Sequence, residues 1–272
     1  MMSEFICTTC GTQYAASESP PAQCAICEEY RQFVLPAGTS WTTLAKLRVT
    51  HKATFHDEQG ILGIGTSPDI GIGQRALLVR TPTGNILWDC IALIDNAMVE
   101  IINALGGLTA IAISHPHYYT TMTEWSRAFG NIPVWLHKAD AQWIMRGGDC
   151  VKLWEGDAKE LAPGVTLIRT GGHYEGGTVL HWAQAAGGKG AILSADLLQV
   201  TPDRRFLSFM RSYPNYLPLG EKAVRAVAAT VEPYKYDAVY GAFWDRVIPK
   251  DAKAIMDASV RRHIEWLNKD AL

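Results

Sequence analysis

Four of the six cysteines lie in two closely spaced pairs near the start of the chain. Cys7 and Cys10 form one C-x2-C pair, and Cys24 and Cys27 form a second pair after thirteen intervening residues. A C-x2-C turn directs two thiolates at one point, so two such turns supply the four sulfurs of a closed tetrahedral site. The spacing predicts a structural metal site. Zinc and iron both accept four thiolates in this geometry, so the metal itself stays open.

The segment around these cysteines resembles a zinc ribbon or the metal knuckles of rubredoxin. We expect it to form a module over residues 1–37, with a short closing strand at 31–34 and a linker at Pro36-Ala37-Gly38. So short a module has too small an apolar core to fold on that core alone. Metal binding would therefore supply its folding free energy.

A pair of histidines follows a strongly apolar stretch in the middle of the chain. Residues 108–114 read as a strand that is buried on both faces, and this strand leads directly into His115-Pro116-His117. On extended backbone, residues two apart lie on the same side of the chain. Both imidazoles are therefore candidates to bind one metal ion.

Two later strand ends also carry residues that bind metals. His173 lies in the glycine-rich stretch 171–177, where glycines allow a close approach of the backbone, and Asp196 follows a predicted strand at 190–194. Sites in α/β proteins gather at the carboxyl ends of strands. We therefore expect His173 and Asp196 to join the histidine pair.

The order of expected elements indicates an α/β protein. Hairpins come first, and strands then alternate with helices, which is typical of layered α/β folds. The stretch Gly71-x-Gly73-x-x-Ala76 leads into a strand rather than a helix, so we interpret it as a glycine turn and not as a nucleotide-binding loop. The expected helices are 40–47, 96–105, 139–146, 221–231 and 252–266, and the main strands are 77–81, 85–89, 108–114, 134–137, 166–170, 178–182, 190–194 and 238–241.

From about Leu47 to Leu272 the chain resembles the metallo-β-lactamase superfamily. That family has H-x-H-x-D-H after a buried strand, then a Gly-His, then a late Asp and a final His. The positions that match are His115, His117, His173 and Asp196. The resemblance implies a four-layer αβ/βα sandwich over residues 38–272, with its metals at the edge between two sheets.

The chain departs from this family at the ligands of the second metal. Tyr119 and Thr120 stand where the family has Asp and His, and Ala242-Phe243-Trp244 stands where the final His is expected. Asp89 stands where the family carries a structural D-x-G-like corner, and the following Cys90 departs from that pattern. The resemblance therefore implies a single active-site metal, held by three histidines with Asp196 as the candidate fourth ligand. The remaining histidines match no motif: His51, His56, His137, His181 and His263.

The leading functional hypothesis is a metal-dependent hydrolase that uses a mononuclear zinc-bound water on an ester, thioester or lactone. Asp196 would orient or deprotonate the nucleophile, and Tyr119 would hydrogen-bond the developing oxyanion. Two alternatives stay open. One is a sulfur dioxygenase-like enzyme with mononuclear iron, and the other is a non-catalytic metal-binding scaffold or sensor.

Charge and composition narrow the partners. The 25 basic and 27 acidic residues give a formal charge of −2 with no block of one sign, so neither nucleic acid nor a membrane surface is an expected partner, and a small-molecule substrate is. The first residues lack the pattern of a signal peptide, and no apolar run reaches eighteen residues. Paired cysteines of the metal-binding type fit a reducing compartment, so we expect a cytoplasmic protein.

Overall fold

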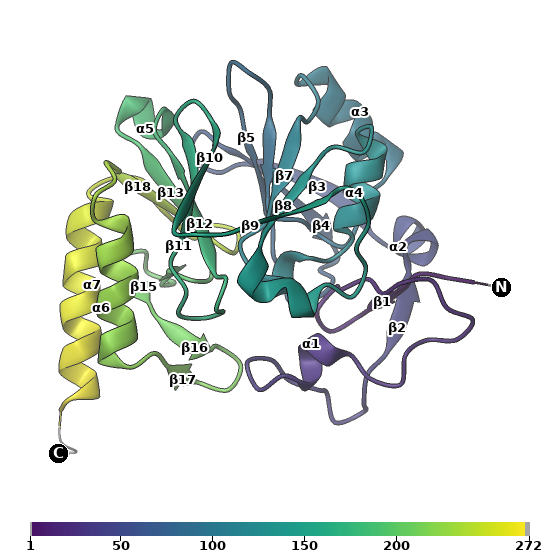
Figure 1. The fold of residues 1–272 in the computed structure, drawn as a ribbon, viewed down its shortest axis with the longest axis horizontal. Coiled ribbons are helices and arrows are strands. Elements are labelled where there is room, and N and C mark those ends of the chain that lie inside the picture. Colours follow the sequence, from purple (N-terminus) through teal and green to yellow (C-terminus); the bar gives the residue numbers. More distant parts are fainter. Residues whose placement is uncertain (1, 270–272) are drawn as a thin grey trace. The chain divides into compact units, whose positions relative to one another are not determined.

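The computed structural model describes residues 2–269, which divide into two compact units. Unit 1 is Met1–Trp154 and unit 2 is Glu155–Leu272. Each unit contains one large sheet, with seven strands in unit 1 and six in unit 2. In Figure 1 the chain runs from purple at its start to yellow at its end.

The sheet of unit 1 changes from antiparallel to parallel along its width. Strands β3 to β6 form an antiparallel meander, and β6 to β9 pair in parallel. The strands are β3 (Lys52–Asp57), β4 (Leu62–Ser67), β5 (Ala76–Val79), β6 (Ile86–Trp88), β7 (Ala110–Ala112), β8 (Val134–His137) and β9 (Val151–Trp154).

Helices connect the parallel strands of unit 1. Helix α3 (Asn96–Ala104) joins β6 to β7, and α4 (Met122–Ala128) lies between β7 and β8 (Figure 1). Asp95 caps α3 by accepting a hydrogen bond of 2.8 Å from the Met98 amide, which satisfies one of the free N–H groups at the helix start. Between them, the short 3₁₀ helix η1 (Pro116–Tyr118) carries His117.

The cysteine segment of unit 1 differs from the expected one. Strand β1 (Phe5–Cys7) pairs with β2 (Trp41–Thr43), whereas residues 31–34 form no strand. The predicted helix 40–47 is instead β2 followed by α2 (Leu44–Thr50). The prediction was wrong here because the edge of β1 selects its partner through tertiary pairing, which local propensity does not reveal. Helix α1 (Ala25–Glu28) follows the second cysteine pair, and the module boundary at residue 37 stays a prediction.

Unit 2 combines an antiparallel meander with one parallel pair. Strands β10 to β13 are antiparallel, β13 and β18 are parallel, and β19 closes the edge. The strands of this sheet are β10 (Ala158–Ala162), β11 (Val165–Arg169), β12 (Thr178–Trp182), β13 (Ala191–Ala195), β18 (Ala238–Gly241) and β19 (Val247–Ile248).

Two helices and several short elements complete unit 2. Helices α6 (Glu221–Val231) and α7 (Ala252–Leu267) run side by side in green and yellow in Figure 1, and both lie where the sequence predicts helices. The short elements are α5 (Ala185–Gly188), β14 (Gln199–Val200), β15 (Leu207–Ser208), β16 (Met210–Ser212) and β17 (Leu217–Pro218).

The mixed α/β class expected from the sequence is confirmed. The predicted helix 139–146 is a 3₁₀ helix, η2 (Lys138–Trp143), and β9 and β10 were not predicted. Within residues 2–269, no helix is both long enough and apolar enough to cross a bilayer.

Candidate metal centres

The four paired cysteines gather in unit 1 as the spacing predicts. All four are buried, and their sulfurs lie within 4.8 Å of one another. Cys7 Sγ is 3.7 Å from Cys27 Sγ, and Cys10 Sγ is 3.6 Å from Cys24 Sγ. Tetrahedral bonds of about 2.3 Å to zinc place sulfurs about 3.8 Å apart. The sulfur positions therefore fit a four-thiolate metal ion.

Aromatic side chains surround the cysteine cluster. Tyr14, Trp41 and Trp143 pack against it, and the rings of Tyr14 and Trp41 meet edge to face at 5.1 Å. The Tyr14 hydroxyl lies 3.5 Å from Cys24 Sγ, toward which it donates. Hydrogen bonds with the thiols of Cys10, Cys27 and Cys7 lower the pKa of Cys24. The cluster therefore favours at least one thiolate, which is the form that binds metals.

His115 and His117 follow the end of β7 in unit 1. His115 has extended backbone, with φ −170° and ψ 174°, and His117 lies in the adjoining η1 helix. Their ring centroids are 4.8 Å apart, and both side chains are buried. The predicted same-side placement of this pair is thus realised by an extended residue and a tight turn.

Polar neighbours fix the backbone and one ring of this pair. The Ser114 amide donates to Asp89 Oδ1 at 2.8 Å, and the Ser114 hydroxyl lies 2.9 Å from His115 Nδ1. On the other side, Gln74 Nε2 donates to the carbonyl of His117 at 3.1 Å. Outer partners of this kind orient metal-binding histidines. By accepting from the Ser114 amide, Asp89 fixes the backbone just before His115.

His173 and Asp196 lie in unit 2, where they follow β11 and β13. His173 Nδ1 lies 3.1 Å from the carbonyl of Met210 in β16. A carbonyl can only accept, so Nδ1 carries the proton and Nε2 presents its lone pair. Arg211 adds hydrogen bonds of 3.1 and 3.2 Å to the carbonyls of Gly172 and His173. The imidazole is therefore held in the tautomer and orientation of a metal ligand.

The Asp196 backbone is also held in place. Its carbonyl accepts a hydrogen bond of 2.8 Å from the hydroxyl of Tyr213, and its side chain is buried. Burial raises the pKa of Tyr213 well above the usual range, and the nearby charge of Asp196 adds to this. Tyr213 therefore stays protonated at neutral pH and remains a donor. Ala195 has φ 50°, so the chain turns sharply just before the carboxylate.

Tyr119 ends the η1 turn and is buried. Its amide bonds to the carbonyl of Pro116 at 3.2 Å, and its own carbonyl accepts from Met122 at 3.0 Å. These contacts fix its backbone. The catalytic role expected for its hydroxyl stays a prediction.

Three histidines that match no motif bond to the backbone instead. His181 Nε2 lies 2.8 Å from the Lys235 carbonyl, and His263 Nε2 lies 2.9 Å from the Leu219 carbonyl. The amide of Ala139 donates to His137 Nδ1 at 3.2 Å. These are the contacts of structural histidines.

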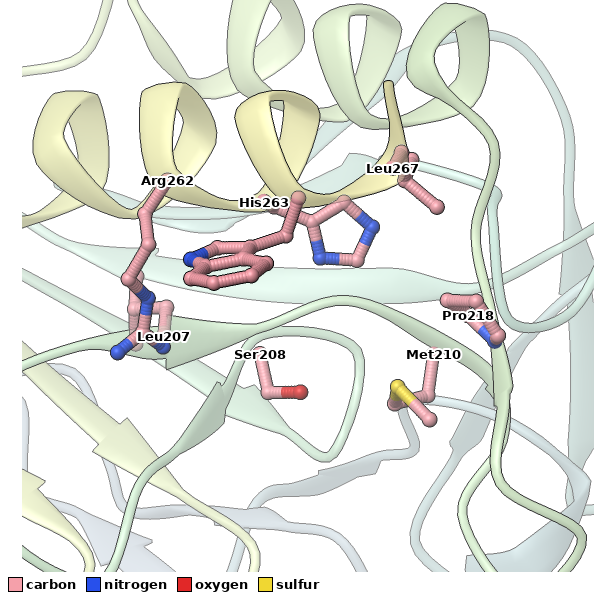
Figure 2. A pocket seen from close by; sticks show the side chains of 8 residues that line it. Leu207, Ser208, Met210, Pro218, Arg262, His263 and Leu267 are labelled. Atoms are coloured by element: carbon pink, nitrogen blue, oxygen red, sulfur yellow. The ribbon is translucent and has the colours of Figure 1, made fainter. Parts of the chain in front are cut away.

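A pocket of about 420 Å³ lies in unit 2, beside helix α7 (Figure 2). Its lining includes one histidine, His263, and no carboxylate or thiol, so it lacks a metal-binding set. Met210 lines it, although the carbonyl of the same residue supports His173. The lining consists of Leu207, Ser208, Met210, Pro218, Arg262, His263, Trp266 and Leu267.

Sequence reasoning missed the residues that support the ligands. Gln74 and Tyr213 each reach a ligand's backbone from a distant part of the chain, and Arg211 does the same for His173. Ser114 was the one with a signal, since it directly precedes His115. The other three give no local pattern.

Comparisons with known proteins identify a relative and a fold. No protein-family model matches the chain. It is 40% identical over 272 residues to the uncharacterized protein YmaE of Bacillus subtilis (strain 168), which covers 99% of this chain and 98% of the relative.

The solved structures that it resembles include TMB-1 and two metallo-β-lactamases, DIM-1 and SMB-1. DIM-1 exposed to ceftazidime is 14% identical with a TM-score of 0.59, and covers 80% of this chain and 98% of that one. TMB-1 is 10% identical with a TM-score of 0.58, at 80% and 99%. SMB-1 in complex with mercaptoacetic acid is 18% identical with a TM-score of 0.50, at 76% and 92%. At these identities the likeness is one of fold.

Proposed function

The chain belongs to the family of Bacillus subtilis YmaE and has the metallo-β-lactamase fold, and we propose that it is a metal-dependent hydrolase. The proposed ligands are His115 and His117 of unit 1 with His173 and Asp196 of unit 2, each of which offers one ligand atom. The observation that carries the proposal is the hydrogen bond from His173 Nδ1 to the Met210 carbonyl, because it prepares Nε2 to bind a metal.

The donor set suits a single catalytic zinc ion. Three imidazoles are nitrogen donors of the kind that zinc accepts, and with Asp196 beside the ion as the candidate fourth ligand or base they leave a position for water. When bound by three histidines, zinc lowers the pKa of its water ligand to about 7 and so supplies hydroxide at neutral pH. We infer one metal rather than two at this site, because Tyr119 and Thr120 replace two ligands of the second metal.

Two side chains of this protein would perform the proton and charge chemistry. The Asp196 carboxylate orients the attacking water and accepts its proton, which is the work of a positioned general base. Tyr213 holds the Asp196 backbone by a hydrogen bond, which fixes the point from which the carboxylate side chain extends. The Tyr119 hydroxyl donates a hydrogen bond to the oxyanion that develops on the substrate.

We propose an ester, thioester or lactone as the substrate. Hydrolysis of a carbonyl compound needs one activated water and one oxyanion donor, which this site supplies. Phosphodiester hydrolysis commonly uses two metals about 3.5–4 Å apart, and the inferred single metal argues against it. DIM-1 and SMB-1, which share the fold, are metallo-β-lactamases by name, and this supports carbonyl chemistry.

The cysteine cluster is proposed to hold a second, structural zinc ion through Cys7, Cys10, Cys24 and Cys27. The two sulfur separations support it, as does the burial of all four thiols. Four thiolates complete the coordination of zinc and leave no position for substrate. This metal therefore acts on the fold and not on the reaction.

Metal analysis and turnover on the same samples test the proposal. We expect two zinc ions per chain in the wild type and activity on a panel of aryl esters, thioesters and lactones. His173→Ala should lose one zinc ion and all turnover, whereas the exposed His56 of β3 provides the control variant His56→Ala. Activity that survives His173→Ala, or that requires ferrous iron and oxygen, would overturn the hydrolase.

A further inference from the structure

We call residues 7–13, which begin with the first cysteine pair, the first cysteine knuckle. This segment lies directly against the turn that carries the histidine pair. We call residues 115–121 the histidine loop. The amide of Gln13 donates to the carbonyl of Thr120 at 3.1 Å. A Cβ built on Gly11, whose φ is +81°, would lie 3.4 Å from Thr120 Cγ2 and 3.3 Å from Ala92 Cβ. The knuckle thus contacts the histidine loop through both backbone and side chain.

A second connection runs through the glycine turn before β5. A Cβ built on Gly71, whose φ is +68°, would lie 3.1 Å from the carbonyl carbon of Cys10, so this turn sits tightly on the knuckle. Gln74 connects this glycine turn to the histidine loop. Its Oε1 accepts from the Ile72 amide at 3.1 Å, and its Nε2 donates to the His117 carbonyl at 3.1 Å.

The histidine loop needs such support because its backbone is strained. Thr120 has φ 29°, in the left-handed region that a β-branched residue rarely adopts. Conformations of this kind persist only where the surroundings over-determine them. The hydrogen bond from Gln13 acts on the strained residue itself. Gln13 in turn contacts Arg146, which also bonds to Glu124 Oε1 at 2.6 Å.

We propose that the four-cysteine module holds the histidine loop in its conformation, a role that we call the clamp. We also propose that Gln74 is the positioning residue that holds His117 in place. A metal ion bound by the cysteines fixes Cys10 and Gly11, and these residues fix the loop through Gly71, Gln74 and Thr120. Loss of the cysteine-bound metal therefore weakens metal binding at His117. The inference rests on the proposed metal sites and extends them by coupling one to the other.

Gln74→Glu is the sharpest single change. The carboxylate still accepts from the Ile72 amide but cannot donate to the His117 carbonyl. Gln184 is the matched control, because its Nε2 also donates to a backbone carbonyl, that of Pro163, at 3.3 Å in unit 2. Zinc affinity is measured by competition with a chelator, separately for the cysteine site and the histidine site. We expect Gln74→Glu to weaken zinc at the histidine site about 10- to 100-fold, the usual effect of removing an outer partner.

In the same variant, the cysteine site should keep its zinc affinity, and Gln184→Glu should change neither site. A purely structural role for Gln74 would lower the melting temperature and leave the histidine-site affinity unchanged. That result would overturn the assignment of Gln74.

Hydrogen exchange tests the clamp without any substrate. Cys24→Ser removes one thiolate, and His115→Ala serves as the background that leaves only the cysteine metal. In that background we expect Cys24→Ser to speed amide exchange across residues 116–121 at least tenfold, with no change in β11 to β13 of unit 2. Unchanged exchange in the histidine loop, beside faster exchange in residues 5–13, would overturn the clamp.

The two proposals fail in different ways. Zinc affinities and exchange rates can be measured even on a protein with no turnover on any ester. The test of the clamp is therefore independent of the test of hydrolysis. Should Cys24→Ser not fold, Gln74→Glu still tests the connection that runs through Gln74, because it leaves all four thiols in place.

Discussion

The backbone amide of Ser114 donates a hydrogen bond of 2.8 Å to Oδ1 of Asp89. This bond fixes the chain one residue before His115. Asp89 reaches it from a left-handed conformation with φ 64°, which Asp adopts more readily than most residues. The aspartate is buried and its own amide bonds to the Ala112 carbonyl at 2.8 Å. Asp89 therefore joins the end of β6 to the start of the histidine loop.

Asp89→Ala removes the acceptor of the Ser114 amide and places alanine in the left-handed region. We expect it to lower the free energy of unfolding by about 2–4 kcal/mol, the sum of a buried unsatisfied N–H and backbone strain. Asp89→Asn keeps an acceptor and suits the same backbone, so its loss should be smaller than about 1 kcal/mol. Urea denaturation measures both, and equal losses would contradict the role assigned to the hydrogen bond.

Asp196→Asn separates metal binding from proton transfer. We expect this variant to keep most of the metal and to lose roughly 10²–10⁴ in rate, the range for a positioned general base. His115→Ala should instead lose the metal together with the activity. Metal content and turnover are taken from the same preparation. Metal that falls in parallel with the rate in Asp196→Asn would make Asp196 a ligand first.

The two cysteines outside the cluster should differ in reactivity. Burial raises the pKa of the Cys90 thiol well above its usual range, and the nearby charge of Asp89 raises it further. Cys150 is half-buried. Because the thiolate is the reactive form, a thiol reagent at neutral pH should label Cys150 and leave Cys90 unmodified.

Mass spectrometry of the zinc-loaded protein identifies which cysteines are labelled. Cys150→Ser is the control variant, which should abolish labelling. Unfolding with a chelator should expose all six thiols. Labelling of Cys90 in the folded protein would contradict its enclosure.

A buried ion pair between Arg75 and Glu58 should be sensitive to removal of one partner. Arg75 Nη2 lies 2.9 Å from Glu58 Oε2, and their side chains are only 1% and 5% exposed. Arg75→Met leaves the carboxylate buried without its partner, which commonly costs about 3–5 kcal/mol. The double variant Arg75→Met/Glu58→Leu should be more stable than Arg75→Met alone. Thermal unfolding of the three proteins checks the order.

Residue types and spacing were enough to predict where the candidate ligands stand within each unit. His115, His117, His173 and Asp196 stand at the ends of β7, β11 and β13 because an apolar strand followed by a polar residue leaves a local pattern. The cysteine pairs are equally local. The metallo-β-lactamase fold followed from the order of these motifs, and the structural comparisons confirm it.

The supporting contacts made by Gln74 and Met210 could not be predicted, because each joins residues far apart in the chain. Gln74 lies 43 positions before His117, and Met210 lies 37 positions after His173. The same reason explains the wrong strand at 31–34. The partner of β1 is Trp41–Thr43, and only the folded edge of β1 selects it.

The division of the proposed ligands along the chain would also set an order of metal loading during synthesis. The cysteine set is complete once Cys27 has left the ribosome, whereas the proposed catalytic set awaits Asp196. At about 5–20 residues per second, translation separates the two by roughly 8 to 34 seconds. A nascent chain short of zinc would thus fill its cysteines first and complete its histidine loop before the catalytic ion arrives.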